Sequence, residues 1–193
     1  LRFFCAFLKR FALGAHLMGE GGETMTEFET IYRRYFTDVE LYLRAITKDA
    51  FLAEELTEET FVKLVLKRPR FSGDASFKTW LYTIARNTAI DYLRRHKNAA
   101  LPLEETAPIC DEEVDLERSY IQQEDRQLLH SCMKRLKPEY RQVLWLSYFE
   151  GFSYQQIGRI MKKTTHGVET LAYRARVALK NLMIKEGYNY EGL

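Results

Sequence analysis

The sequence predicts an all-α protein with two small helical domains, joined by a flexible acidic linker, the C-terminal one a helix-turn-helix. Apolar residues recur at steps of three and four along most of the chain, which is the helical period, and no long stretch has the period of two typical of a strand. Charge is also unevenly spread. The 193 residues have a formal net charge of +2, but residues 98–125 hold one basic and nine acidic side chains, net −8, and residues 126–193 hold twelve and five, net +7.

The first 24 residues differ from the rest of the chain. Residues 1–17 are apolar but interrupted by three basic side chains, and no convincing small-residue cleavage site follows them. Residues 19–23 would be encoded by purine-rich codons just before Met25, as a translated ribosome-binding site would be. We therefore expect residues 1–24 to be a non-native or disordered extension. The alternative is an amphipathic N-terminal helix that touches a membrane.

Three helices are expected in residues 25–97. The first begins near Thr26. Asp49 is placed to cap a second helix over about 50–67, because its short polar side chain can accept from the first free backbone amides. After a loop, Ser76 is placed to cap a third helix in the same way. Packed together, the three would bury one small core.

Residues 98–119 break the helical pattern. They contain two of the four prolines and most of the acidic excess, so we expect a flexible linker. Helicity resumes in residues 120–193. Pro138 fits the first turn of a helix that runs to about Phe149, because a first-turn proline costs no hydrogen bond. Residues 150–152 are expected to form a turn.

A capping-box pattern at Ser153 and Gln156 begins a short helix, which a tight turn at 162–164 separates from a longer one. This arrangement predicts a helix-turn-helix, whose second helix would enter the major groove of DNA. Outward positions on that helix are His166, Glu169, Thr170, Tyr173, Arg174 and Arg176. The alternative is a helical hairpin with a solvated polar face, and the charge of +7 weighs against it.

The N-terminal domain carries two opposed charge patterns. Its second helix has an acidic patch, made of Glu54, Glu55, Glu58 and Glu59. Its third helix and the loop before it are basic, with Lys67, Arg68, Arg70, Lys78, Arg86, Arg94, Arg95 and Lys97. An acidic patch would repel DNA, so it favours a basic protein partner, although a merely solvated face remains the alternative.

Aromatic residues lie among these basic ones, and unpaired bases stack on aromatic rings. Phe77 and Trp80 share the apolar stripe of the third helix, so packing explains them better. Phe71 and Tyr82 are the freer candidates for contact with single-stranded DNA.

Together these segments resemble the bacterial extracytoplasmic-function sigma factors of RNA polymerase. The resemblance covers about 26–96 and 120–185. Its motifs are Ala53-Glu-Glu-Leu-Thr-Glu-Glu-Thr-Phe61, Phe77-Lys-Thr-Trp-Leu81, Ile84-Ala-Arg-Asn87, Asp91-Tyr-Leu-Arg-Arg95, Leu136-Lys-Pro-Glu-Tyr-Arg-Gln-Val-Leu144, Gly151-Phe-Ser-Tyr-Gln-Gln-Ile157 and Tyr173-Arg-Ala-Arg176. Each motif alone is weak, but their order and spacing together are specific.

The resemblance implies that residues 25–97 are region two and residues 120–193 are region four of a sigma factor. Region two would bind the clamp helices of the polymerase through Glu54, Glu55, Thr57, Glu58 and Glu59. It would open the −10 element and hold the melted strand with Phe71, Ser72, Gly73, Asp74, Lys78, Arg86, Asn87, Arg94 and Arg95. Region four would dock on the polymerase flap and recognise the −35 duplex with Thr165, His166, Glu169, Thr170, Tyr173, Arg174 and Arg176.

The resemblance also implies a cytoplasmic protein that responds to stress or to the envelope, with an anti-sigma factor as partner and no small-molecule substrate. Some positions depart from the family. Lys162 occupies a turn position where glycine is usual, and Gly158 one where alanine is usual. The start of the second helix, residues 165–171, lacks the lysine and arginine common there.

Two other classes of function are alternatives. One is a helix-turn-helix activator or repressor that acts without polymerase, although such a protein has no use for the acidic patch. The other is a small helical enzyme. The three cysteines and four histidines show no metal-ligand spacing, and no phosphate loop or nucleophile–base motif is present in the sequence. We therefore expect no metal and no cofactor. No apolar run approaches the length of a membrane span.

Overall fold

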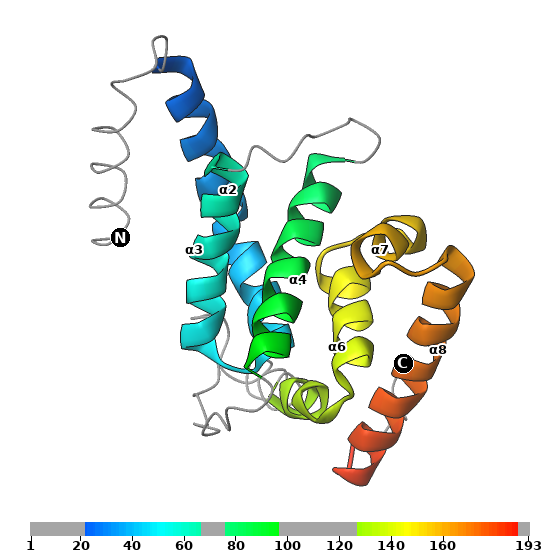
Figure 1. The fold of residues 1–193 in the computed structure, drawn as a ribbon. Coiled ribbons are helices and arrows are strands. Elements are labelled where there is room, and N and C mark those ends of the chain that lie inside the picture. Colours follow the sequence, from blue (N-terminus) through cyan, green and yellow to red (C-terminus); the bar gives the residue numbers. More distant parts are fainter. Residues whose placement is uncertain (1–21, 67–75, 97–126, 189–193) are drawn as a thin grey trace, which may run out of the picture. The chain divides into compact units, whose positions relative to one another are not determined.

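The computed structural model describes residues 22–66, 76–96 and 127–188 (Figure 1). No strand occurs among these residues, which confirms the all-α prediction for this part of the chain. The expected loop before the third helix and the acidic linker lie outside the described residues. The elements are α2 (Gly22–Thr47), α3 (Ala50–Leu66), α4 (Phe77–Arg95), a helical segment at 127–135, α6 (Pro138–Leu144), a π-helical turn η1 (Trp145–Phe149), α7 (Tyr154–Met161) and α8 (Thr165–Lys185).

The chain divides into two compact units, residues 1–37 and residues 38–193. The described part of the first unit is the beginning of α2. Its rings at 28, 32 and 36 follow one another at helical spacing, with centroids 6.1 and 4.7 Å apart. The helix starts at Gly22, so it extends into the segment that we expected to be a non-native or disordered extension.

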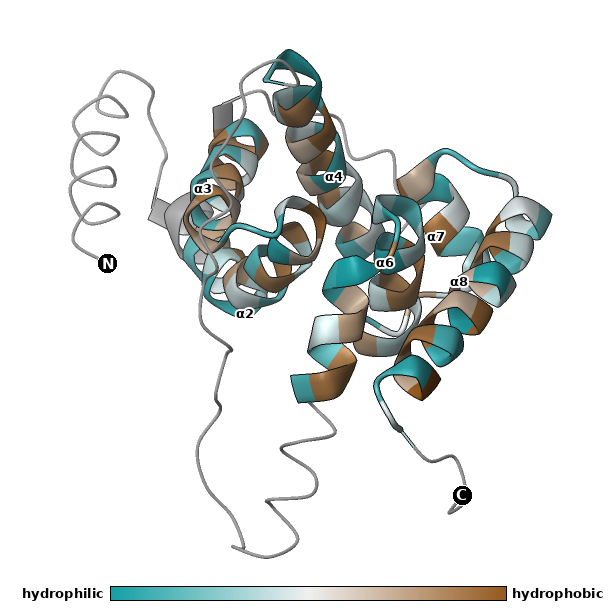
Figure 2. Cartoon of the chain, turned by 90° about the horizontal axis from the view of Figure 1, so that it is seen from below, coloured by the Kyte–Doolittle hydropathy of each residue, from teal (hydrophilic) through white to brown (hydrophobic). Residues whose placement is uncertain are grey.

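In the second unit, α3 packs against α4, and Tyr42 of α2 lies against Tyr82 of α4 with ring centroids 5.2 Å apart. The cap predictions for both helices are confirmed: an Asp49 carboxylate oxygen accepts from the Leu52 amide at 3.1 Å, and the Ser76 hydroxyl accepts from the Thr79 amide at 3.2 Å. The fully or nearly fully buried apolar residues of this part are Val39, Tyr42, Leu43, Ile46, Leu52, Ala53, Leu56, Phe61, Leu81, Tyr82, Ala85 and Ala89. Figure 2 shows hydrophobic and hydrophilic residues on the same helices, as amphipathic packing requires.

The C-terminal helices also follow the predicted boundaries. Pro138 opens α6, and the capping box of Ser153 and Gln156 is complete, with both bonds present. The helix that begins at Pro138 ends in the π-helical turn η1, which the sequence did not indicate. A loop at 150–152 follows, and Gly151 there has a φ of +67°, which a residue without a Cβ adopts at no steric cost.

The turn between α7 and α8 depends on two unusual residues. Lys162 ends α7 in the left-handed conformation with a φ of +56°, where glycine is normally favoured. One turn earlier, a Cβ at Gly158 would lie only 2.7 Å from the backbone oxygen of Lys163. The turn therefore passes so close to α7 that position 158 needs a glycine, and Thr164 then caps α8.

A buried arginine joins α6 to the end of α2. Arg141 is 3% exposed, and its guanidinium donates to the backbone oxygens of Ala45 and Ile46, which are among the free carbonyls at the C-terminal end of α2. It also donates to the oxygens of Lys134 and Leu136, at 3.1 and 3.2 Å. Burial lowers the pKa of Arg141 to about 10, and the group remains charged at neutral pH.

Candidate nucleic-acid interface

The acidic patch on α3 is present as an exposed surface. Glu54, Glu55 and Glu58 are exposed, whereas Glu59 is partly covered and forms an ion pair with Lys63 at 2.7 Å. The Lys63 ammonium also donates to the Thr88 hydroxyl on α4 at 3.0 Å. Three carboxylates thus remain available for a partner, while the fourth helps to hold α3 against α4.

Thr57, which the resemblance assigned to the same surface, lies on the opposite side of the helix. Its side chain is fully buried, and its hydroxyl donates to the Ala53 oxygen at 2.7 Å. Thr57 therefore cannot touch a partner in this structure. The spacing of the buried residues 53, 56, 57 and 60 contained this information, because these positions share one helix face.

The candidate −10 residues differ in accessibility. Phe71, Ser72, Gly73 and Asp74 lie outside the described residues. At the end of α4, Arg94 and Arg95 are exposed, and Arg94 forms an exposed ion pair with Asp91 at 3.2 Å. Asn87 is half-buried. The C-terminal end of α4 thus presents an accessible cationic surface.

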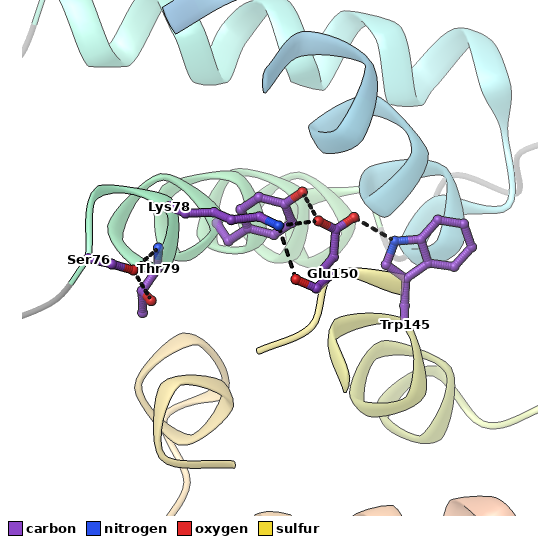
Figure 3. A network of polar contacts seen from close by, with 6 residues as sticks. Ser76, Lys78, Thr79, Trp145 and Glu150 are labelled. Carbon is purple, nitrogen blue, oxygen red and sulfur yellow. Dashed lines mark hydrogen bonds and ion pairs between the residues drawn. The ribbon is translucent and has the colours of Figure 1, made fainter. Parts of the chain in front are cut away.

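Lys78 and Arg86 are not accessible in the same way. The Lys78 ammonium forms an ion pair with the Glu150 carboxylate at 3.0 Å and also donates to the Glu150 backbone oxygen at 3.0 Å (Figure 3). The Arg86 Nε donates to Gln142 at 3.0 Å. These two basic side chains of α4 are therefore held by residues from the C-terminal half of the chain.

Tyr82, expected to be free to stack on a base, is fully buried, so that expectation is wrong for this structure. Its ring packs edge-on against Phe152 at 5.0 Å, and its hydroxyl donates to Glu150 at 2.5 Å. Burial and the hydrogen bond to Glu150 raise the pKa of Tyr82, which stays protonated. The sequence offers no signal for this contact, because the two partners are 68 positions apart.

The second helix of the helix-turn-helix exposes most of its predicted residues. Thr165, His166, Glu169, Tyr173, Arg174 and Arg176 are exposed, and Thr170 is half-buried. Val168, Ala172 and Ala175 are buried on the opposite side, as the helical period predicted. This helix therefore presents a continuous polar surface outside the core.

A tyrosine pair positions one cation of that surface. The Arg176 guanidinium donates to the Tyr154 hydroxyl at 3.1 Å. Hydrogen bonds to Tyr154 and Tyr148 raise the pKa of Arg176. Near the start of α8, the His166 imidazole lies 3.5 Å from a Glu169 carboxylate oxygen.

Within the described residues, no group of three histidine, cysteine or acidic side chains could hold a metal ion. None of the helices described is long and apolar enough to cross a membrane.

Comparison with known proteins places both halves in one family. The family model for sigma-70 region 2 matches residues 31–99, and that for sigma-70 region 4 matches residues 126–179. The RNA polymerase sigma factor YlaC of Bacillus subtilis is 31% identical, over 81% of this chain and 92% of the relative. The ECF RNA polymerase sigma factor SigM of the same organism is 30% identical, over 80% of this chain and 93% of the relative.

A solved structure has the same fold. It is the sigma factor RpoE in complex with the anti-sigma factor NepR from Bartonella quintana. The TM-score is 0.68 at 21% identity, and the match covers 84% of this chain and 99% of that one.

Proposed function

We propose which of the described surfaces makes each contact in transcription initiation. The premise is that this chain belongs to the extracytoplasmic-function sigma factors of the sigma-70 family. A sigma factor binds core RNA polymerase and directs it to promoters, which distinguishes this protein from a helix-turn-helix regulator that acts alone. The domains are residues 25–97 for region two, 98–119 for the linker and 120–193 for region four.

The acidic face of α3 is our candidate for the contact with core polymerase. The supporting observation is that Glu54, Glu55 and Glu58 are exposed on one side of a helix whose other side is buried. Three neighbouring carboxylates repel DNA phosphates and attract a basic protein surface. Thr57 supports the helix from inside instead of touching the partner.

DNA contacts fall on two other helices. In region two, Arg94, Arg95 and Asn87 would neutralise the backbone of the melted −10 strand, with Lys78 and Arg86 once these are released. In region four, α8 would enter the major groove at the −35 element, with Thr165, His166, Glu169 and Thr170 near base edges and the arginines at phosphates. Stacking and charge neutralisation offset the cost of unpairing, so the protein acts by binding and is not an enzyme.

The partner set includes an anti-sigma factor. Support comes from the fold shared with a sigma factor that was solved together with one. We propose that the chain acts in the cytoplasm, where the polymerase and the promoter are. We expect an anti-sigma factor that is itself held at the membrane to restrain the chain.

Reversing the charge at Glu55 and Glu58 tests the core contact. We expect the double variant E55K/E58K to fold normally and to bind purified core polymerase at least tenfold more weakly in a low-salt binding assay, a loss of about 1.4 kcal/mol or more. Reversal at Glu29, which is exposed on α2, is the matched control and should leave binding unchanged. Equal binding by wild type and double variant would refute the assignment of this surface.

A further inference from the structure

Phe51 is the most exposed large apolar side chain in the part of the chain that the structure describes. It lies in the first turn of α3 and is 78% exposed, whereas the next two residues, Leu52 and Ala53, are buried. Its ring therefore points away from the core. A single apolar side chain on a surface is common, so its exposure indicates a function only if its neighbours point to a partner.

Phe51 shares one face of α3 with the acidic patch. Steps of three and four residues place 51, 54, 55 and 58 above one another on the helix, and all four are exposed. Val62 and Val65 continue this face and are half-buried. The exposed face therefore has an aromatic ring at one end, carboxylates in the middle and two valines beyond them.

The spacing along this face suits a partner helix. Residues 51, 55, 58, 62 and 65 follow one another at alternating steps of four and three. Side chains with this spacing form the seam along which one helix packs lengthwise on another. The core of the protein uses the opposite side of α3, where residues 52, 53, 56, 57 and 60 are buried. The seam is thus available to a partner.

The corner between α2 and α3 holds the backbone of Phe51 in place. The Thr47 hydroxyl donates to the Leu43 oxygen at 3.0 Å and accepts from the Asp49 amide at 3.3 Å. The Asp49 carboxylate in turn accepts from the Leu52 amide, one residue after Phe51. An aromatic ring on a fixed backbone loses little conformational freedom when a partner buries it, so this position suits an anchor.

The charge of the face determines which kind of partner fits. The carboxylates of Glu54, Glu55 and Glu58 repel the phosphates of nucleic acid. A second copy of this chain fits poorly as well, because a twofold dimer would place the same acidic face on both sides of the contact. A basic protein surface that also offers an apolar site fits the whole face, with ion pairs around a buried ring.

We propose that Phe51 is the apolar anchor of the contact with core polymerase, buried against an apolar site that lies beside the cations facing the acidic patch. This inference deepens the proposed function, on which it rests. The carboxylates attract and orient the polymerase surface, and salt screens that attraction. Burial of the ring supplies a part of the affinity that salt does not screen, because it depends on apolar area removed from water.

Truncation of the ring in the full chain tests the anchor. Binding to purified core polymerase is measured for F51A, F51L and E55K/E58K over a series of salt concentrations. We expect F51A to bind about tenfold more weakly at every salt concentration, a loss of about 1.4 kcal/mol. F51L keeps most of the apolar area and should lose less than about threefold. The E55K/E58K variant should lose most at low salt, where charge is least screened.

Ile184 provides the matched control. It is 49% exposed near the end of α8, and none of the surfaces proposed above uses it. Ile184→Ala should bind core within about twofold of wild type, and circular dichroism should show that both alanine variants are folded. Wild-type affinity in F51A, or an equal loss in F51A and Ile184→Ala, would overturn the anchor.

A photocrosslink identifies what covers the ring. Phe51→p-benzoylphenylalanine keeps an aromatic side chain and should form a product with a polymerase subunit, in lower yield when E55K/E58K is also present. A product only with a second copy or only within the same chain would overturn the proposal. If E55K/E58K loses core binding and F51A does not, the anchor alone is refuted. Failure of wild type to bind core refutes the sigma assignment and the anchor together.

Discussion

The two helices assigned to DNA, α4 and α8, differ in what covers them. On α8 the predicted contact residues are exposed apart from Thr170, and the buried positions lie on the other side. On α4 the basic residues Lys78 and Arg86 bond to Glu150 and Gln142, and only the C-terminal arginines are exposed. The surface that we propose for duplex recognition is therefore exposed, whereas two of the five described residues that we propose for strand capture, Lys78 and Arg86, are covered. The accessibility of a basic side chain thus depends on its contacts with distant residues, which its place in the sequence does not reveal.

The largest effect should come from Arg141, which anchors the C-terminal half to the end of α2. Arg141→Ala leaves four backbone oxygens without a strong donor, and an unmet buried acceptor costs about 1–3 kcal/mol. We expect a loss of roughly 3–5 kcal/mol in the free energy of unfolding, less than the sum because water replaces part of the guanidinium. Chemical denaturation followed by circular dichroism measures this.

Arg135→Ala is the control for the Arg141 variant. Its ion pair with Glu186 is about half exposed on both sides, and such pairs contribute about 0–1 kcal/mol. A loss as small in Arg141→Ala as in Arg135→Ala would show that the buried guanidinium does not hold the halves together.

A substitution at Gly158 tests the close packing of the turn that precedes α8. An added methyl group would meet the Lys163 oxygen at 2.7 Å, and backbone cannot move aside as a flexible side chain does. We expect Gly158→Ala to lower the free energy of unfolding by about 1–3 kcal/mol, the usual cost of overpacking. Thermal denaturation provides the measurement. An unchanged melting temperature would mean that the turn is more adaptable than its geometry indicates.

Single arginine substitutions on α8 and α4 compare directly how much each helix contributes to DNA binding. Arg174 is exposed, whereas Arg86 is held by Gln142. In the free chain, Arg174→Ala should weaken binding to duplex DNA by up to about tenfold across sequences and reduce the salt slope by about one. Arg86→Ala should leave duplex binding unchanged. Fluorescence anisotropy over a salt series tests both, and equal losses would contradict the difference between the two helices.

Lys162→Gly should act in the opposite direction from Gly158→Ala. Lys162 is held in the left-handed conformation, which costs a residue with a side chain about 1 kcal/mol relative to glycine. We expect the variant to be more stable by about 0.5–1 kcal/mol, with a higher melting temperature. A lower melting temperature would show that the lysine makes a compensating contact.

The smallest effect is expected at Tyr42, a buried residue of α2 whose ring lies 5.2 Å from that of Tyr82. Its hydroxyl is buried without a hydrogen-bond partner among the described residues, and burial raises its pKa. Tyr42→Phe removes an unmet polar group, so stability should be unchanged or higher by up to about 1 kcal/mol. Tyr82→Phe, in contrast, should be destabilising because that hydroxyl is bonded to Glu150. Denaturation curves for the pair decide between these outcomes.

Local signals in the sequence predicted most of the helix boundaries. Asp49, Ser76 and Ser153 all cap helices where their short polar side chains indicated, because a cap depends only on neighbouring residues. Nothing in the sequence pattern indicated the π-helical turn η1. The contacts of Lys78 and Tyr82 with Glu150 could not be predicted, because they join residues that are 72 and 68 positions apart. Tyr82 was misassigned for the same reason. Thr57 was different, because its helical spacing already indicated the buried face.

Trp145 gives the contact between Glu150 and α4 an optical signal of its own. Its indole nitrogen donates to Glu150, so the surroundings of the ring would change if that contact opened. The chain has one other tryptophan, Trp80, and a Trp80→Phe variant would leave Trp145 as the sole emitter. A red shift of its fluorescence on mixing with polymerase would then show that the contact opens, without an attached dye.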